Sequence, residues 1–244
     1  MSESNFATKL QVLKDLKNAC ALMAGYNPLQ QLIKVAVMNT RIGDIEAANT
    51  EIISFESILT DNQLERKLKV RGQIENDLFD GLIRRSRQIA NYVDGMGDKY
   101  ESEAIQIRRL VIKMEPSITR RKSTGPDDKT HSTSEQSYDS ITANAGKILG
   151  IIKLMKTAGV SDYTPADTNI TEAHYSDLIT EILNLTKKIA ETESKLKPFL
   201  KKRETLTNRK SDGIRKILSE TKKYVRGNYG SNSPEYNSIR LIKV

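Results

Sequence analysis

The end of the chain repeats an earlier stretch at a spacing of 132 residues. Residues 78–112 and 210–244, aligned without a gap, are identical at eight of 35 positions. The identical pairs are Asp80/Asp212, Gly81/Gly213, Tyr92/Tyr224, Val93/Val225, Gly95/Gly227, Glu103/Glu235, Ile107/Ile239 and Arg108/Arg240. A repeat of this length predicts that one structural unit occurs twice.

A second repeated motif precedes a long segment in each half. The sequence Tyr-x-Pro occurs at residues 26–28 and again at residues 163–165, a spacing of 137 residues. Between the halves, residues 115–136 are rich in Ser and Thr, include two prolines and show no hydrophobic period. We therefore predict a first helical unit over residues 1–114, a flexible linker over residues 115–136 and a second, basic helical unit over residues 137–244.

Hydrophobic residues recur at helical spacing in the first half of the chain. They predict helices over residues 5–24, 29–59 and 64–93, with a turn or a cap at residues 60–63. Within the second of these helices, one apolar position recurs every seven residues and forms a coiled-coil-like seam, at Met38, Ile45, Ile52 and Leu59. Such a seam requires a partner helix along its length.

The second half shows the same order of helices. Pro198 is expected in the first turn of a last helix that runs to Arg226. Gly95 and Gly227 are expected to end helices in the left-handed conformation that glycine favours. The predicted fold class is all-α, with two tandem three-helix units of antiparallel helices, packed either as two small bundles or as one longer bundle.

The end of the second half resembles a group of uncharacterised bacterial all-helical proteins. The resemblance is carried by "YTPADTNITEAHYSDL" at residues 163–178, a long helix, and "YVRGNYGSNSPEYNSI" at residues 224–239. In that group, a Phe is expected where this chain has Tyr229. The resemblance implies an all-helical, duplicated fold. It implies no activity, so no functional residue is carried over from the group.

The sequence contains no residue pattern of a catalytic, cofactor or metal site. Glu172 and His174 are separated by one residue, where a pair of ligands on one helix face needs two. The only cysteine, Cys20, lies in an apolar run, where we expect a buried hydrophobic side chain. No glycine-rich phosphate loop follows a predicted strand. We therefore predict no catalytic residue, no metal and no cofactor, and a protein that is not an enzyme.

Positive charge is concentrated near the end of the chain. Residues 1–114 contain 16 basic and 15 acidic side chains, whereas residues 195–226 contain 12 basic and three acidic ones. A cationic helix can contact several phosphates, although the same pattern is typical of a solvated helix face. The candidate anion- or partner-binding residues are the cations of this predicted last helix: Lys201, Lys202, Arg203, Arg209, Lys210, Arg215, Lys216, Lys222, Lys223 and Arg226.

Arg71, Glu75 and Arg85 lie on the apolar stripe of the predicted helix over residues 64–93, and Arg203 repeats Arg71, so three roles are open for such an arginine. The side chain can extend past apolar neighbours to the surface, form a buried ion pair, or bind a ligand.

Three classes of function are open at this point. The leading hypothesis is a non-enzymatic interaction or scaffold protein, with a protein partner or self-association, because long seams occur without a catalytic constellation. The first alternative is binding of an anion or of nucleic acid through the basic last helix. The second is a membrane-associating helical bundle, which we do not favour because no segment is apolar on all sides. The N-terminal residues lack the pattern of a signal peptide, so we expect a cytoplasmic location.

Overall fold

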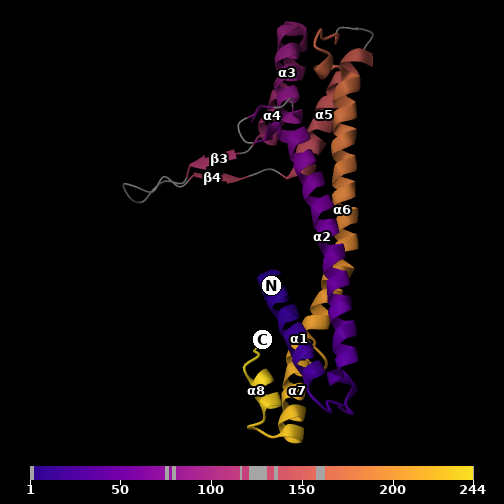
Figure 1. Ribbon diagram of the computed structural model, residues 1–244. Helices are drawn as coiled ribbons and strands as arrows, with labels where there is room; N and C mark the ends of the chain where they lie inside the picture. Colours follow the sequence, from indigo (N-terminus) through magenta and orange to yellow (C-terminus); the bar gives the residue numbers. More distant parts are fainter. Residues whose placement is uncertain are drawn as a thin grey trace, which may run out of the picture. The chain divides into compact units, whose positions relative to one another are not determined.

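The computed structural model of the protein is all-α, as the sequence predicts (Figure 1). It describes residues 3–74, 77–78, 81–115, 117–120, 131–134, 137–157 and 163–243. Among these residues each half of the chain contributes four α-helices rather than the predicted three. The fold class is therefore confirmed, and the helices are divided differently.

The elements of the first half follow one another in the order helix, long helix, short helix, short helix. They are α1 (Glu3–Leu22), η1 (Gln31–Ile33), α2 (Val35–Arg71), β1 (Gln73–Ile74), β2 (Asp77–Leu78), α3 (Leu82–Gly95), η2 (Asp98–Tyr100) and α4 (Glu101–Met114). The two short strands pair antiparallel.

The second half repeats this order. Its elements are α5 (Tyr138–Thr157), η3 (Thr168–Ile170), α6 (Glu172–Asn208), α7 (Ile214–Tyr229) and α8 (Pro234–Arg240). The first helices α1 and α5 have 20 residues each, and the long helices α2 and α6 have 37 residues each.

The predicted linker contains a described hairpin. Strands β3 (Ser117–Arg120) and β4 (His131–Ser134) pair antiparallel, with Ser117 opposite Ser134. Residues 121–130, as well as 116, 135 and 136, lie outside the described residues.

The chain divides into two compact units, and each unit takes segments from both halves of the sequence. Unit 1 comprises residues 1–58 and 191–244, and unit 2 comprises residues 59–190. Helices α2 and α6 therefore each contribute to both units. The sequence halves 1–114 and 137–244 do not coincide with these units, because a repeat in the sequence does not determine which segments pack together.

The core of unit 1 joins α1 and η1 to helices from the other half. Leu13, Leu16 and Cys20 of α1 are at most 1% exposed and belong to one hydrophobic cluster with Ile217 and Val225 of α7. Ile239 of α8 is fully buried in the same cluster. Figure 1 shows α1, α7 and α8 close together.

The core of unit 2 is likewise formed by helices from both halves of the chain. Ile148 and Ile152 of α5 are fully buried in a cluster with Ile89 of α3 and Ile107 of α4. Here the first helix of the second half packs against the short helices of the first half.

The repeated Tyr-x-Pro motifs make equivalent contacts in the two units. The hydroxyl of Tyr26 donates to the carbonyl oxygen of Ile33 at 2.7 Å, and the hydroxyl of Tyr163 donates to that of Ile170 at 2.6 Å. The ring of Tyr26 meets Tyr224 edge to face, with centroids 5.3 Å apart, and that of Tyr163 meets Tyr92 at 5.4 Å. Each tyrosine thus contacts a residue from the opposite half.

Two arginines of the long helices are also equivalent. In unit 1, Arg203 lies over the ring of Phe6, 4.3 Å from its centroid, and its Nη1 donates to Asn49 at 3.3 Å. In unit 2, Arg66 lies over Tyr138 at 4.2 Å and donates to Thr186 at 3.4 Å. Each arginine fixes the first helix of the opposite half against its own long helix, through a cation–π contact of about 0.5–2 kcal/mol.

The predicted turn or cap at residues 60–63 is wrong. Helix α2 continues through these residues to Arg71, since they include neither Gly nor Pro to end it. The helix ends at Gly72, which takes the left-handed conformation with a φ of 65°. Gly81, which falls inside the predicted helix over residues 64–93, lies at the N-cap of α3 and is closely packed.

The predicted last helix is also divided differently. Pro198 lies inside α6 rather than in the first turn of a new helix. The segment that follows α6 separates it from α7, so the cations of residues 195–226 do not form one continuous rod. After α3 and α7, the glycines with positive φ are Gly97 and Gly230, with φ of 98° and 97°, and not the predicted Gly95 and Gly227.

The seam of α2 is covered by the chain itself. Met38, Ile45 and Ile52 are fully buried within unit 1, while Leu59 is partly buried. The partner that the heptad spacing requires is therefore supplied intramolecularly at these three positions.

Gly213 is the tightest glycine of unit 1. It is the N-cap of α7, and a Cβ at this position would lie 2.4 Å from the carbonyl oxygen of Arg209. Because the clashing atom is backbone, a side chain can be accommodated only if the turn between α6 and α7 moves.

We predict that Gly213→Ala lowers the free energy of unfolding by about 1–3 kcal/mol, the usual cost of overpacking. The matched control is Gly43→Ala, in an exposed interior position of α2 with open space around it. It should raise stability by up to about 1 kcal/mol, because alanine favours the helix. Urea unfolding followed by circular dichroism measures both. Equal stability of Gly213→Ala and the wild type would contradict the packing described here.

Candidate functional site

A pocket of about 520 Å³ lies in unit 1 where α6 ends and α7 begins. Five of its lining residues are basic: Lys9, Arg209, Lys210, Arg215 and Lys216. The other three are neutral residues that can form hydrogen bonds: Thr207, Asn208 and Ser219. Among the described residues that line it, none has an acidic or an aromatic side chain.

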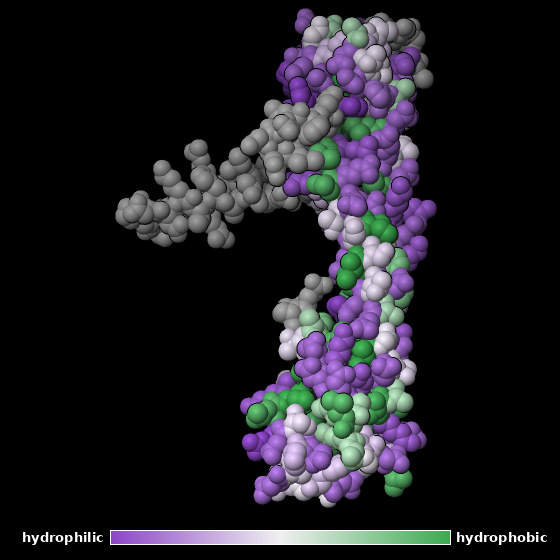
Figure 2. Space-filling model, viewed as in Figure 1, coloured by the Kyte–Doolittle hydropathy of each residue, from purple (hydrophilic) through white to green (hydrophobic). Residues whose placement is uncertain are grey.

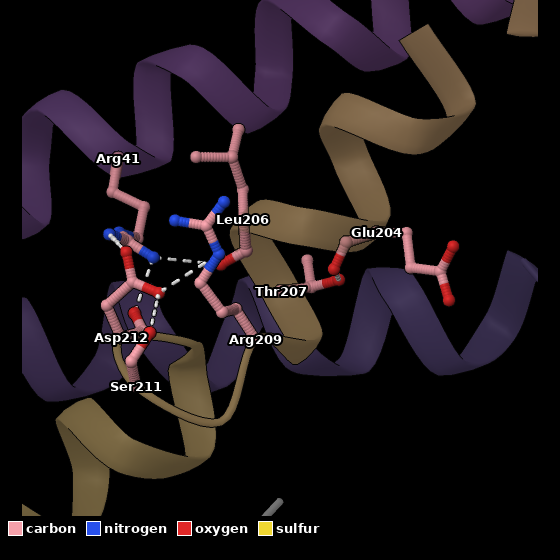
Figure 3. A network of polar contacts seen from close by, with 7 residues as sticks. All are labelled: Arg41, Glu204, Leu206, Thr207, Arg209, Ser211 and Asp212. Atoms are coloured by element: carbon pink, nitrogen blue, oxygen red, sulfur yellow. Dashed lines mark hydrogen bonds and ion pairs between the residues drawn. The ribbon is translucent and has the colours of Figure 1, made fainter. Parts of the chain in front are cut away.

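Arg41 of α2 holds the turn between α6 and α7 in place (Figure 3). Its Nη1 donates to the carbonyl oxygens of Leu206, at 3.1 Å, and Asp212. Its Nη2 donates to the carboxylate of Asp212 at 3.1 Å. The side chain of Arg41 is only 12% exposed, so these contacts are shielded from water and determine the path of the turn.

Asp212 is ionised over the whole neutral range. Burial raises the pKa of its carboxyl, but the hydrogen bonds from Arg41 and Ser211 and the charges of Arg41 and Arg209 together lower it below its ordinary value of 3.8. Asp212 thereby neutralises Arg41, and its second oxygen lies 3.7 Å from Nε of Arg209.

The five cations of the pocket differ in how far they are already neutralised. Arg209 shares Asp212 with Arg41, and Lys216 pairs with Glu220 at 3.0 Å. Lys9 donates to the side-chain oxygen of Asn208 at 2.7 Å.

Lys210 and Arg215 are both exposed, and within the described part of the chain neither has an acidic partner. The pocket therefore keeps an excess of positive charge.

Four of the ten predicted candidates lie together in this pocket: Arg209, Lys210, Arg215 and Lys216. Two other groups of candidates lie on the surface outside its lining: Lys201 and Lys202 on α6, and Lys223 and Arg226 on α7. Figure 2 shows that hydrophilic residues cover much of the visible face, with smaller hydrophobic patches between them.

Two predicted candidates have structural contacts instead. Arg203 is 8% exposed and contacts Phe6 and Asn49. Its side chain therefore does not extend to the surface, and within the described part of the chain it forms no ion pair. Lys222 donates to the carbonyl oxygens of Arg240, at 2.9 Å, and Ile242, at 2.6 Å, at the end of α8. Burial, followed by the charge of Lys243, lowers the pKa of Lys222.

Sequence reasoning did not find Lys9. This residue lies on α1, about 200 positions before the other pocket cations, in a half of the chain where basic and acidic residues are nearly balanced. Only the packing of α1 against helices of the second half brings Lys9 to the pocket, and no pattern in the sequence indicates that exchange.

A pocket of about 430 Å³ in unit 2 has a different character. His174 is part of its lining, together with three acidic residues: Glu65, Asp177 and Glu181. Lys69 lies 2.8 Å from Glu181 and 3.8 Å from Glu65, so charges of both signs are already paired there. An excess of one charge thus distinguishes the pocket of unit 1.

Cys20 is buried and free, as expected. Burial raises the pKa of its thiol to about 11, and a hydrogen bond with Tyr26 acts in the opposite direction. The thiol is therefore protonated near neutral pH, which fits a packing role.

Among the described residues, no helix has the length and apolar character needed to cross a membrane. Within the same residues, His, Cys, Asp and Glu side chains do not gather in groups of three or more that could hold a metal ion. Comparison with protein-family models, curated proteins and solved structures finds no match. The resemblance to a bacterial group of helical proteins stays a prediction.

We predict that Arg41→Met lowers the free energy of unfolding by about 2 kcal/mol at pH 7, because it leaves a carboxylate and two carbonyls without their donor. The charge on Asp212 supports folding above the ordinary carboxyl pKa and loses this effect as pH falls through the lowered pKa of the folded state.

The difference between wild type and Arg41→Met should therefore stay constant from pH 8 to about pH 5 and shrink only below about pH 4. Thermal unfolding across this pH range measures it. The control is Lys202→Met, which breaks an exposed pair at 3.8 Å with Asp44 and should change stability by less than about 0.5 kcal/mol. A difference that vanishes already at pH 6 would contradict the assignment.

Proposed function

We propose that the protein binds an anionic ligand in the pocket at the start of α7 and catalyses no reaction on it. The observation that carries this proposal is the lining of the pocket, with five basic side chains from α1, the turn and α7 and no acidic one. Concave sites that collect charge of one sign concentrate a ligand of the opposite sign.

The surrounding contacts support a preformed site. Arg41 fixes the turn that presents Arg209 and Lys210, and the closely packed Gly213 fixes the start of α7. A ligand therefore meets cations whose backbone is already ordered, and little ordering entropy has to be lost on binding.

The hypothesis of an interaction or scaffold protein stays a prediction with less support. Its sequence basis was the heptad-like seam, and Met38, Ile45 and Ile52 of that seam are buried against the chain itself. Self-association and a cytoplasmic location likewise stay predictions, and membrane association stays the alternative that the sequence disfavours.

The test is fluorescence anisotropy with labelled duplex DNA, labelled RNA and labelled inorganic polyphosphate, each at low and at moderate salt. We expect at least one of these anions to bind, more weakly at the higher salt concentration. The double variant Lys210→Glu/Arg215→Glu should lower the affinity about tenfold or more, since it removes two pocket cations that have no acidic partner among the described residues.

The matched control is Lys201→Glu/Arg226→Glu, which changes the net charge equally at exposed positions outside the pocket. It should change the affinity less than about threefold. The proposal fails if none of the anions binds, or if the two double variants weaken binding to the same extent.

A further inference from the structure

Two carboxylates near the pocket of unit 1 are each shared between two cations. Asp212 lies 3.1 Å from Nη2 of Arg41 and 3.7 Å from Nε of Arg209. Glu220 likewise pairs with two lysines, at 3.0 and 3.1 Å. Each of these groups of three charged side chains therefore keeps one positive charge.

Two further cations of the lining add to this excess. Lys210 and Arg215 have no acidic partner among the described residues. A phosphate monoester carries about 1.5–2 negative charges at pH 7, whereas a carboxylate carries one. The guanidinium group of Arg215 also has the planar fork that binds two oxygens of one phosphate. Charge and geometry therefore favour a phosphate over a single carboxylate.

Arg215 is a cation that the repeated fold does not require. Gly81 and Gly213 are the N-caps of α3 and α7, so Ile83 and Arg215 are equivalent positions two residues further along the chain. Ile83 is only 9% exposed, whereas Arg215 is exposed and lines the pocket. The cation at this position is thus a feature of the pocket in unit 1 and not of the architecture that both units share.

The pocket offers carbon as well as charge. Five of its eight described lining residues are lysine or arginine, and carbon atoms form more of its surface than nitrogen and oxygen atoms do. Long cationic side chains present their methylene groups as apolar surface below the charged ends. An inorganic anion contacts only the charged ends, whereas an anion with a carbon skeleton also covers the methylene groups. The volume of about 520 Å³ is within the usual range of small-molecule sites, about 300–1,000 Å³.

Resting on the proposed function of this pocket, we propose that its ligand is a phosphate monoester of a non-aromatic alcohol. The phosphate binds Arg215 and Lys210, and the carbon skeleton lies over the methylene groups of the lining. Ser219 is exposed in the lining and supplies a hydrogen-bonding group for a hydroxyl of the skeleton. The described lining has no aromatic side chain on which a nucleobase could stack, which favours an aliphatic or sugar skeleton.

Isothermal titration calorimetry of the full chain with orthophosphate, methyl phosphate and propyl phosphate, at pH 8 and one ionic strength, tests this inference. Each carbon that the lining covers should raise the affinity about two- to fourfold, because its burial removes apolar surface from water. We therefore expect propyl phosphate to bind about tenfold more tightly than orthophosphate. Equal affinities of the three anions would overturn the contact with the carbon skeleton.

A pair of double variants tests whether this pocket is responsible. Lys210→Gln/Arg215→Gln should weaken the binding of propyl phosphate about tenfold, whereas Lys201→Gln/Arg226→Gln, at exposed positions outside the lining, should weaken it less than about threefold. Circular dichroism should show unchanged thermal unfolding for both, since all four side chains are exposed. Equal weakening by the two double variants would overturn the pocket as the binding site.

Further outcomes separate this inference from the proposed function. Binding of inorganic polyphosphate that depends on Lys210 and Arg215, without a gain from methyl to propyl phosphate, would overturn the ligand class and leave anion binding standing. Tighter binding of butyrate than of propyl phosphate would likewise overturn the phosphate. The absence of binding to every one of these anions would overturn both proposals.

A phosphate monoester can be a soluble metabolite or the headgroup of a lipid, and one further arm distinguishes these sources. The probe is a phosphatidylcholine vesicle with or without phosphatidic acid, which carries a phosphate monoester. Sedimentation of the protein with the phosphatidic acid vesicles alone, displaced by propyl phosphate, would support the ligand class and identify a lipid source. Sedimentation that propyl phosphate does not displace would contradict binding of the monoester in the pocket.

Discussion

Hydrophobic packing between helices from opposite halves of the chain is the interaction on which both units depend. Leu13 and Leu16 of α1 are fully buried in a cluster with helices of the second half, and Ile148 and Ile152 of α5 are fully buried with helices of the first. Each such side chain stabilises the fold by about 1.5–3 kcal/mol. Since a domain has a net stability of only about 5–15 kcal/mol, neither unit is expected to persist without the helix that the other half supplies.

The candidate site is a consequence of this exchange. Lys9 reaches the pocket because α1 packs with α7 and α8, and Arg203 stabilises that position through the ring of Phe6. Arg41 of α2 holds the turn that presents Arg209 and Lys210. Because the pocket combines residues from both halves, it can occur in unit 1 alone, even though both units contain the same order of helices. The mixed charges of the pocket in unit 2 fit this difference.

The sequence allowed the all-α class and the burial of Cys20 to be anticipated, because each depends on local patterns. It also showed that the Tyr-x-Pro motif is repeated, but not which residues the two tyrosines contact. It failed at residues 60–63, where polar residues suggested a turn but the end of α2 is set by the conformation of Gly72. Four pocket cations were found because they are close together in the sequence. Lys9 was missed, since long-range packing is not encoded in composition or periodicity.

The reciprocal exchange of helices can be tested by cutting the chain between its halves. A protease recognition sequence inserted within residues 121–130 allows cleavage under native conditions, and a denaturing gel confirms that the cut is complete. If each unit contains helices from both halves, the two fragments elute together at the volume of the uncut chain and separate only in denaturant. Elution of two separate, folded fragments would contradict the exchange, and with it the account of the pocket.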